Sequence, residues 1–419
     1  MAIRQPNGEA EELSELPMQL DDIAFGGYKA FPGGDNGEAE EEKLQRFTLA
    51  PLTVIFGKNS SGKSAVVRLP RLLLGGMECQ DERLLPLEVR GLRYGGRFLD
   101  LVHGGAFFRR PTFQLRAECE GDRLEFMVTL YSEGALAADK PPQIWSYRMR
   151  EPEVIDLSPR PSEGASRSAF RGLLPSDARW DRWRDRAGTM LDEMIHLGPT
   201  RAGVQPSYVE EQPEKLGWDG REAPQWLRSD DELADEVSSW FQSEMGGWSL
   251  SVSRGTETFS LRVGMSKTMT TNLAHAGEGL HHVLPVVVHQ LLRQRPGPGT
   301  FLDIIEHPDL HLHAAAQAPL ADLFIRTALQ GRGSLLVETH SQPILLRIQR
   351  RVAEGELPPD RVALYFVDID AEGSNLRPIE IESNGEVSWW PAGVFEEDFQ
   401  EVAALRRAQR SGPKPGASR

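Results

Sequence analysis

Cysteine is nearly absent from this chain of 419 residues, which contains only Cys79 and Cys119. Two thiols cannot form a disulfide framework, so we expect both to be buried and reduced. Apolar runs of the roughly 20 residues that a membrane helix needs are also missing, and residues 1–17 are polar and acidic without a signal-peptide core. These absences predict a soluble, cytoplasmic protein with no membrane contact.

Positive charge is in deficit as well. Lys and Arg total 47 against 62 Asp and Glu, which gives a formal net charge of -15. A field of this sign does not attract nucleic acid, although a local basic groove stays open as an alternative. The chain also has no internal repeat and no sustained heptads, which argues against a long coiled-coil arm.

One stretch, residues 57–64, matches the phosphate-binding motif G-x-x-x-x-G-K-[ST] without a mismatch. The apolar, β-branched residues 52–56 before it predict a buried parallel strand, and residues 65–74 after it predict a helix. In that context the backbone amides of the loop and the helix N-terminus favour a phosphate group. The residues predicted to contact a nucleotide here are Gly57, Asn59, Ser60, Ser61, Gly62, Lys63 and Ser64.

Two of these residues have predicted chemical roles. Lys63 would reach the β- and γ-phosphate oxygens as a point charge, and the Ser64 hydroxyl would be one ligand of Mg²⁺. A glycine-rich turn between a strand and a helix can arise by chance, but the strand and helix patterns on both sides favour the nucleotide site. ATP with Mg²⁺ is the expected cofactor.

The other half of the predicted site comes late in the chain. The apolar run 301–305 ends in Glu306, which could hold the metal ion through water, and the run 334–337 is followed closely by His340, which could contact the γ-phosphate or the attacking water. Taken singly, a strand with a terminal acid and a histidine at a strand end are most often structural. Their place in one set with residues 57–64 favours a catalytic role.

The remaining pattern predicts an α/β fold with parallel strands at both ends of the sequence and a β-rich excursion between them. We expect three regions: an N-terminal lobe (1–84), a β-rich and helical middle (85–270) and a C-terminal lobe (271–419). Further strands are expected at 22–31, 47–50, 112–118, 123–131, 194–201, 300–305 and 363–367, helices at 179–186, 224–245 and 280–292, and a hairpin at 248–263.

These motifs resemble those of the ABC-type ATPases that include SMC, RecF and the OLD nucleases, and more closely the short prokaryotic AAA-type ATPases found with phage-defence genes. The likeness runs over nearly the whole chain. The segments that carry it are 49–64 (opening strand and Walker A), 98–103 (after the lid), 197–201 and 216–220 (central loops), 272–282 (signature loop), 305–313 (Walker B and D-loop), 338–341 (switch histidine) and 384–391 (C-terminal strand and turn).

The resemblance implies a P-loop NTPase head of the ABC type, with a mixed sheet, a β-rich subdomain and a helical insertion. It also implies a homodimer in which the Walker A motif of one protomer faces the signature loop of the other, so that ATP is sandwiched between them. Gly277 and Gly279 would let backbone amides of that loop approach a phosphate. Glu306 would be the Walker B carboxylate, and His340 the switch histidine.

Two departures from the family pattern bear on hydrolysis. Many relatives carry a second acid directly after the Walker B carboxylate as general base, whereas this chain has His307. A neutral imidazole can accept a proton but does not reproduce the charge of a carboxylate, so His307 predicts slow hydrolysis. The signature loop has Leu280 and His282 where the family has polar residues.

Three function classes follow. The first is an ATP-switched homodimeric scaffold for a partner effector, such as a nuclease in antiviral defence. The second is a DNA-engaging ATPase of the RecF kind, and the third a small-molecule P-loop kinase. The DNA-engaging alternative rests on the basic residues Arg90, Arg93, Arg97, Arg109, Arg110 and those of the tail 406–419.

A separate alternative is a transition-metal site. Its candidate ligands are His307, Asp309, His311 and His313.

Overall fold

The computed structural model describes residues 18–33, 41–132, 141–151, 154–157, 169–266, 268–296 and 300–391. Its centre is a six-stranded sheet, called the central sheet, with the order β12-β17-β18-β3-β19-β20. Strands β12 to β19 of this order are parallel, and β20 is antiparallel. They span His196–Leu197, Phe301–Glu306, Gly333–Thr339, Leu52–Gly57, Val362–Ile369 and Ser374–Ile379 in the same order.

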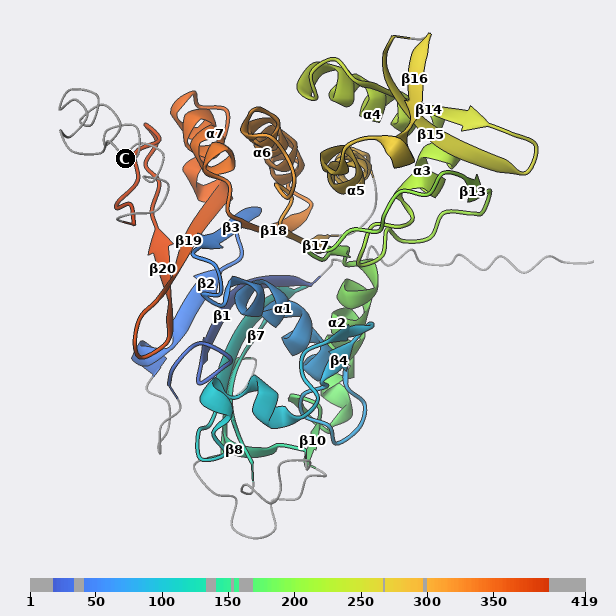
Figure 1. The fold of residues 1–419 in the computed structure, drawn as a ribbon. Coiled ribbons are helices and arrows are strands. Elements are labelled where there is room, and N and C mark those ends of the chain that lie inside the picture. Colours follow the sequence, from blue (N-terminus) through green and yellow to red (C-terminus); the bar gives the residue numbers. More distant parts are fainter. Residues whose placement is uncertain are drawn as a thin grey trace, which may run out of the picture.

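Helices pack on both faces of the central sheet (Figure 1). Successive residues of a strand point to opposite faces of the sheet. On one face, the core packed against a first set of helices includes Leu52, Val54 and Phe56 of β3, and the core on the other face includes Ile55. The first set comprises α5 (Glu278–Gln294), α6 (Ala314–Leu329) and α7 (Gln342–Ala353), and the opposite core contains α1 (Lys63–Glu78). The predicted buried strand and phosphate-loop helix are therefore confirmed.

A second, antiparallel sheet packs on the α1 side, in the order β2-β1-β6-β7-β8-β9. Its strands are Gln45–Thr48, Gln19–Gly26, Thr112–Cys119, Asp122–Tyr131, Gln143–Glu151 and Ile155–Leu157. The alternation at 112–131 correctly predicted antiparallel pairing, with Leu115 opposite Ile23 of β1. Strands from the predicted N-terminal lobe thus pair with strands from the predicted middle, and the boundary near residue 84 stays a prediction.

Helix α2 (Asp181–Glu193) confirms the helix expected at 179–186, where tryptophan and arginine alternate with aspartate. Trp183 is buried in the core shared with α1, and the Arg184 side chain is fully buried. The Arg184 guanidinium donates hydrogen bonds to Asp181 and to the carbonyl oxygens of Leu174 and Pro175. These aromatic and basic residues stabilise the fold rather than forming an open surface.

A smaller outer sheet contains β13 (Tyr208–Val209), β14 (Ser249–Arg254), β15 (Thr258–Ser266) and β16 (Met269–Asn272). The single helix expected at 224–245 is wrong, because the chain forms α3 (Ala223–Ser229) and α4 (Asp231–Glu244). Asp230 adopts an extended backbone (φ -133°), and its carboxylate accepts a hydrogen bond from the amide of Leu233 at 2.9 Å. Aspartate at an N-cap is favourable enough to start a new helix within a continuous amphipathic pattern.

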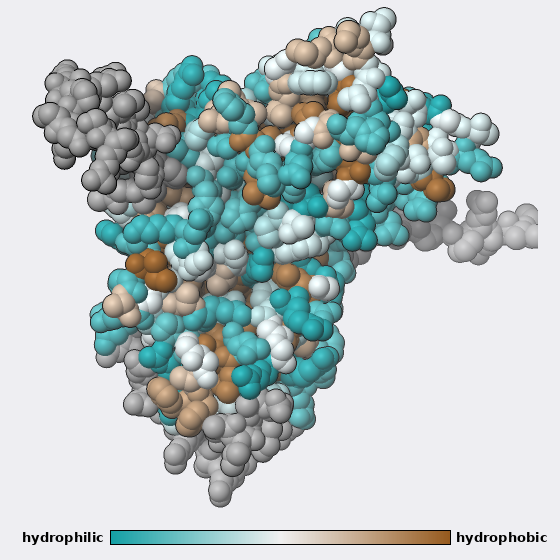
Figure 2. Space-filling view, viewed as in Figure 1, coloured by the Kyte–Doolittle hydropathy of each residue, from teal (hydrophilic) through white to brown (hydrophobic). Residues whose placement is uncertain are grey.

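The remaining described strands form two small hairpins, β4 (Glu88–Val89) with β5 (Leu92–Arg93) and β10 (Phe170–Arg171) with β11 (Leu174–Pro175). Neither cysteine is in a disulfide; Cys119 is buried as expected, but Cys79 is only partly buried. Within the described ranges, no helix is long and apolar enough to cross a membrane. The face in Figure 2 is mostly hydrophilic with small, separate hydrophobic patches.

Candidate active site

The loop between β3 and α1 forms the predicted phosphate cradle. Gly57 has φ 151°, and a Cβ there would lie 2.2 Å from the carbonyl oxygen of Val367, so only glycine fits beside β19. Gly62 has φ 94° and is the N-cap of α1 without a side-chain hydrogen bond, which leaves the first amides of the helix for an anion. The Lys63 ammonium donates to the carbonyl oxygen of Lys58 at 2.6 Å. These features are compatible with phosphate binding, and the contacts predicted for the loop residues stay predictions.

Two carboxylates lie side by side at the ends of β17 and β18, because the parallel register pairs Glu306 with Glu338. The Ser64 hydroxyl donates to Oε1 of Glu338 at 3.1 Å, and Oε2 of Glu338 is buried without a hydrogen-bond partner. Burial, and next the charge of Glu306, raise the pKa of Glu338 to about 7. A hydroxyl group and a carboxylate oxygen without a hydrogen-bond partner both suit a hard cation such as Mg²⁺. Ser64 and Glu338 therefore fit the implied ion.

Glu306 is fully buried, and both of its oxygens are already paired. Arg68 donates to Oε1 and Oε2, each at 2.7 Å, and Nε2 of His196 donates to Oε1 at 2.9 Å. Burial would raise the pKa of Glu306, but the hydrogen bonds from His196 and Arg68 hold it below its ordinary value. The predicted metal role of Glu306 stays a prediction, and Arg68 is its partner in this structure.

The two central loops hold this ion pair in place. The backbone amide of Gly198 donates to the carbonyl oxygen of Trp218 at 2.8 Å, and a Cβ on Gly198 would meet the indole at 1.9 Å. The Trp218 ring lies 4.5 Å from the His196 ring and 5.2 Å from the Arg68 guanidinium carbon. From the same region, Arg201 donates to the backbone oxygen of Glu306 at 2.9 Å.

Removing Arg68 is expected to destabilise the nucleotide-free protein. Arg68→Leu leaves the buried carboxylate of Glu306 with His196 as its remaining side-chain partner, so the free energy of unfolding should fall by about 2 kcal/mol, less than for a fully buried pair because Arg68 is partly exposed. Urea unfolding of Arg68→Leu, Glu306→Gln and the double variant should give a coupling of about 1.5 kcal/mol.

The matched control for this cycle is Arg83→Leu, which removes an exposed arginine paired with the exposed Asp81. Its effect on the free energy of unfolding should stay within about 0.5 kcal/mol. Additive effects of Arg68→Leu and Glu306→Gln would show that the contact contributes nothing.

The predicted histidines lie beside the same carboxylates. The rings of His307 and His340 are stacked, with centroids 5.3 Å apart, and Nε2 of His307 lies 3.6 Å from Oε1 of Glu338. Burial, and next the charge of Lys63, lower the pKa of His340 to about 4. His307 has φ 49° and donates its backbone amide to the carbonyl oxygen of Glu338 at 2.9 Å. The structure thus joins Ser64, Glu306, His307 and His340 through Glu338.

The predicted signature loop lies elsewhere in the protomer. Gly277 is the N-cap of α5, and a Cβ there would have nothing within 4 Å, whereas one on Gly279 would lie 2.6 Å from the carbonyl oxygen of His311. The neighbouring Glu278 lies 3.7 Å from Nε2 of His311. Among the described contacts, no hydrogen bond or ion pair joins this turn to the phosphate cradle of the same chain.

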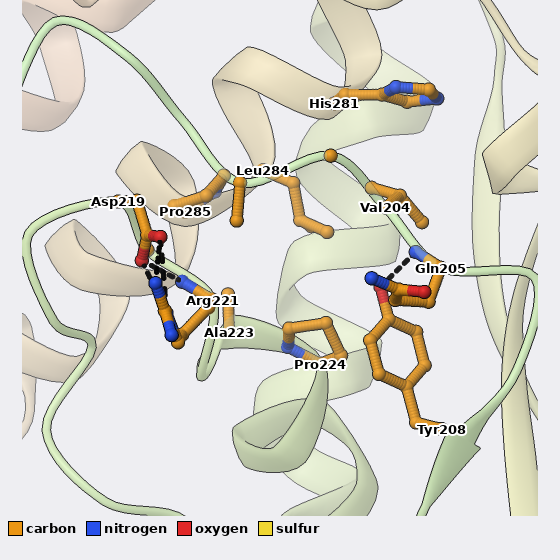
Figure 3. Close-up of a pocket in the computed structure, with 13 residues that line it drawn as sticks. Val204, Gln205, Tyr208, Asp219, Arg221, Ala223, Pro224, His281, Leu284 and Pro285 are labelled. Atoms are coloured by element: carbon orange, nitrogen blue, oxygen red, sulfur yellow. Dashed lines mark hydrogen bonds and ion pairs between the residues drawn. The ribbon is translucent and has the colours of Figure 1, made fainter.

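A cavity of about 320 Å³ lies behind this turn, between α5 and residues 202–224. Figure 3 shows His281, Leu284 and Pro285 of α5 on one side of it and the ion pair of Asp219 and Arg221 on the other. None of its lining residues belongs to the phosphate cradle.

Sequence reasoning did not identify Arg68, His196, Arg201 and Glu338 as site residues. Each had a signal: Glu338 precedes Thr339 and His340 at the end of an apolar strand, and Arg68 lies one helical turn after Ser64. His196 and Arg201 belong to the segment 194–201, which was predicted as a strand entering a loop and whose residues 197–201 were also matched to a central loop of the family. Their partner, Glu306, is more than 100 positions away in sequence.

The loop with the G-x-x-x-x-G-K-[ST] motif follows β3, which lies beside β18, and Glu338 of β18 pairs in register with Glu306 of β17. This arrangement is typical of P-loop proteins. A family model described as "AAA domain, putative AbiEii toxin, Type IV TA system" matches residues 212–347, and one described as "Protein of unknown function (DUF3696)" matches residues 357–405. No curated protein matches the sequence.

Solved structures of Smc head domains share the fold. The Smc head bound to the C-winged helix domain of ScpA is 13% identical, with a TM-score of 0.54 over 87% of this chain and 98% of that chain. An Smc head with an extended coiled coil from Pyrococcus furiosus, bound to the C-terminal domain of ScpA, is 11% identical, with a TM-score of 0.51 over 93% and 100%. The chain therefore shares the fold of an SMC head domain.

Proposed function

We propose that two copies of this chain close around ATP and that the closed dimer controls a partner effector. The observation that carries the proposal is that one protomer has two features suited to phosphate, with no hydrogen bond or ion pair between them among the described contacts. They are the loop at Lys63 and Ser64 and the start of α5 at Gly277, where an added Cβ would have nothing within 4 Å. A second copy can bring the two features together on one triphosphate.

Hydrolysis in this dimer is expected to be slow. The carboxylate of Glu306 is neutralised by Arg68, and the next residue is His307 instead of an acid. Mg²⁺ bound at Ser64 and Glu338 would neutralise charge on the phosphates. A slow ATPase keeps the closed state long enough to act as a switch.

The effector and its setting are also proposed. The description of the matching family model, a putative AbiEii toxin, supports a role in antiviral defence, and the Smc heads with this fold were solved with a ScpA domain bound. The DNA-binding alternative has less support, because Arg90 pairs with Glu78 and Asp192, and Arg93 pairs with Glu88. The basic tail 406–419 lies outside the described residues.

Gly277→Asp is expected to block the ATP-induced dimer without harming the protomer. The backbone at Gly277 (φ -68°, ψ 146°) suits any residue, the new side chain has open space, and aspartate is a favourable N-cap. In the dimer its carboxylate would repel the phosphates bound to the partner. Light scattering with ATP and Mg²⁺ should show a dimer for the wild type and a monomer for Gly277→Asp, with ATP affinity of the protomer unchanged.

Gly277→Asn is the matched control, because asparagine has nearly the size and shape of aspartate without its charge and is an equally good N-cap, and this variant should still form the dimer. A wild-type protein that stays monomeric at saturating ATP would refute the proposal. So would a Gly277→Asp variant that dimerises as well as the wild type.

A further inference from the structure

Three potential metal ligands converge beside the phosphate cradle. The side chains of His307, Glu338 and His340 each present a ligand atom, and these atoms all lie within 4.8 Å of one another. Glu338 belongs to β18, and His307 and His340 directly follow β17 and β18, which pair in parallel. The sheet therefore brings the three residues close together.

The donor set differs from what a Mg²⁺ site provides. Mg²⁺ takes oxygen ligands, whereas imidazole nitrogen suits Zn²⁺ and the neighbouring transition-metal ions. Two histidines and one glutamate, with a fourth position left open, are a ligand set of catalytic zinc sites. Here Glu338 contributes a buried oxygen that has no hydrogen-bond partner, and Ser64 lies next to its other oxygen at 3.1 Å.

The metal alternative from the sequence used different residues. In the structure, Asp309 accepts a hydrogen bond from the Thr339 hydroxyl at 2.5 Å, and His311 packs against His282 with ring centroids 4.8 Å apart. His313 accepts a hydrogen bond from the backbone amide of Ala315, at the start of α6. Of that earlier set, His307 alone belongs to the cluster described here.

We propose that His307, Glu338 and His340 bind one divalent transition-metal ion at the phosphate cradle. The Ser64 hydroxyl contacts Glu338 beside these ligands, and a water molecule or a phosphate oxygen can complete the site. The ligand role replaces the proton-accepting role predicted for His307, and in the nucleotide-free protein it replaces the Mg²⁺-binding role of Glu338. The site deepens the proposed ATPase function, but its metal affinity can be measured without nucleotide and stands apart from dimer formation.

The test is a Co²⁺ titration of untagged, nucleotide-free protein, with Zn²⁺ calorimetry in parallel. The wild type should bind one ion per chain, develop visible d–d absorption of a low-coordinate Co²⁺ centre, and retain it in excess Mg²⁺. His340→Gln should weaken binding by at least about 100-fold, since even residues that only support ligands cost 10- to 100-fold. His313→Gln, which removes an exposed histidine, should bind like the wild type.

His307→Gln and Glu338→Gln provide independent tests, each checked for a native thermal transition before titration. Equal affinity in the wild type and the three ligand variants would overturn the proposal, as would Co²⁺ binding that Mg²⁺ displaces at similar concentration. Loss of the Co²⁺ spectrum in the ligand variants, with ATP-induced dimerisation of the wild type unaffected by zinc chelation, would support the metal site and leave the dimer proposal as a separate question.

Discussion

Lys63→Ala is expected to reduce ATP affinity by about 100-fold or more, which corresponds to about 3 kcal/mol for a lost charge-assisted contact. The Lys63 side chain is almost fully buried, and its ammonium is held by the carbonyl oxygen of Lys58 inside the loop. The ammonium is therefore already oriented toward the space that the phosphates would occupy. In the alanine variant the negative charge of the phosphates would lose this partner. Calorimetry with a non-hydrolysable ATP analogue measures the change.

The Lys63→Ala variant should lose ATP affinity without losing stability in the nucleotide-free state. Burial lowers the pKa of Lys63, which means that the fold pays to keep this charge, although Glu338 and Asp309 offset part of the cost. The melting temperature of apo Lys63→Ala should equal or exceed that of the wild type. Lys58→Ala is the control in the same loop, because its exposed ammonium faces Asp368 at 3.4 Å and its carbonyl is retained. A similar loss of affinity in both variants would contradict a specific role for Lys63.

Asp303→Asn is expected to lower the free energy of unfolding by about 3 kcal/mol, because it breaks a buried ion pair. The fully buried carboxylate of Asp303 in β17 accepts two hydrogen bonds from Arg293, at 2.6 and 2.9 Å, and one from His289 at 2.8 Å. It also accepts the backbone amide of Ile195 at 2.8 Å, which aligns β12 with β17. Asparagine would turn an N–H donor toward groups that are donors themselves.

The titration of Asp303 sets the direction of the pH effect. Burial alone would raise the pKa of this carboxyl, but Arg293 and His289 hold it below its ordinary value. A depressed pKa stabilises the fold above the pKa of the unfolded chain, and this contribution is lost as the pH falls through the folded pKa. The difference between wild type and Asp303→Asn should therefore be largest at neutral pH and shrink in acid.

Urea unfolding at pH 7 and in acid measures this difference, and Asp231→Asn serves as control, because Asp231 is exposed in its contact with Arg254. A loss below about 0.5 kcal/mol for Asp303→Asn, the range of ordinary surface changes, would show that the network is not a stabilising one.

The sequence was most informative where the signal is contiguous. The cradle, its strand and its helix follow from one short motif and the patterns on either side. Glu306 and His340 could be placed at strand ends because the residues of β17 and β18 before them are mostly apolar. Contacts such as Arg68 with Glu306 could not be predicted, because their two residues are 238 positions apart and become neighbours only through the sheet order.

A charged residue inside an apolar run was the sequence signal from which more could have been predicted. Asp303 interrupts the pattern of β17, and a buried acid requires partners. His289 and Arg293 lie one helical turn apart on α5, so both can reach the same carboxylate. Asp230 is a comparable case, since the apolar periodicity continues through it while its side chain starts a new helix.

The contrast between the two signature-loop glycines has a consequence for natural variation. At Gly279 the carbonyl oxygen of His311 leaves no room for a larger side chain, so the fold of the protomer alone requires glycine there. At Gly277 the protomer imposes no such limit. If homologous sequences nonetheless keep position 277 small, selection at that position acts through a surface that lies outside a single chain.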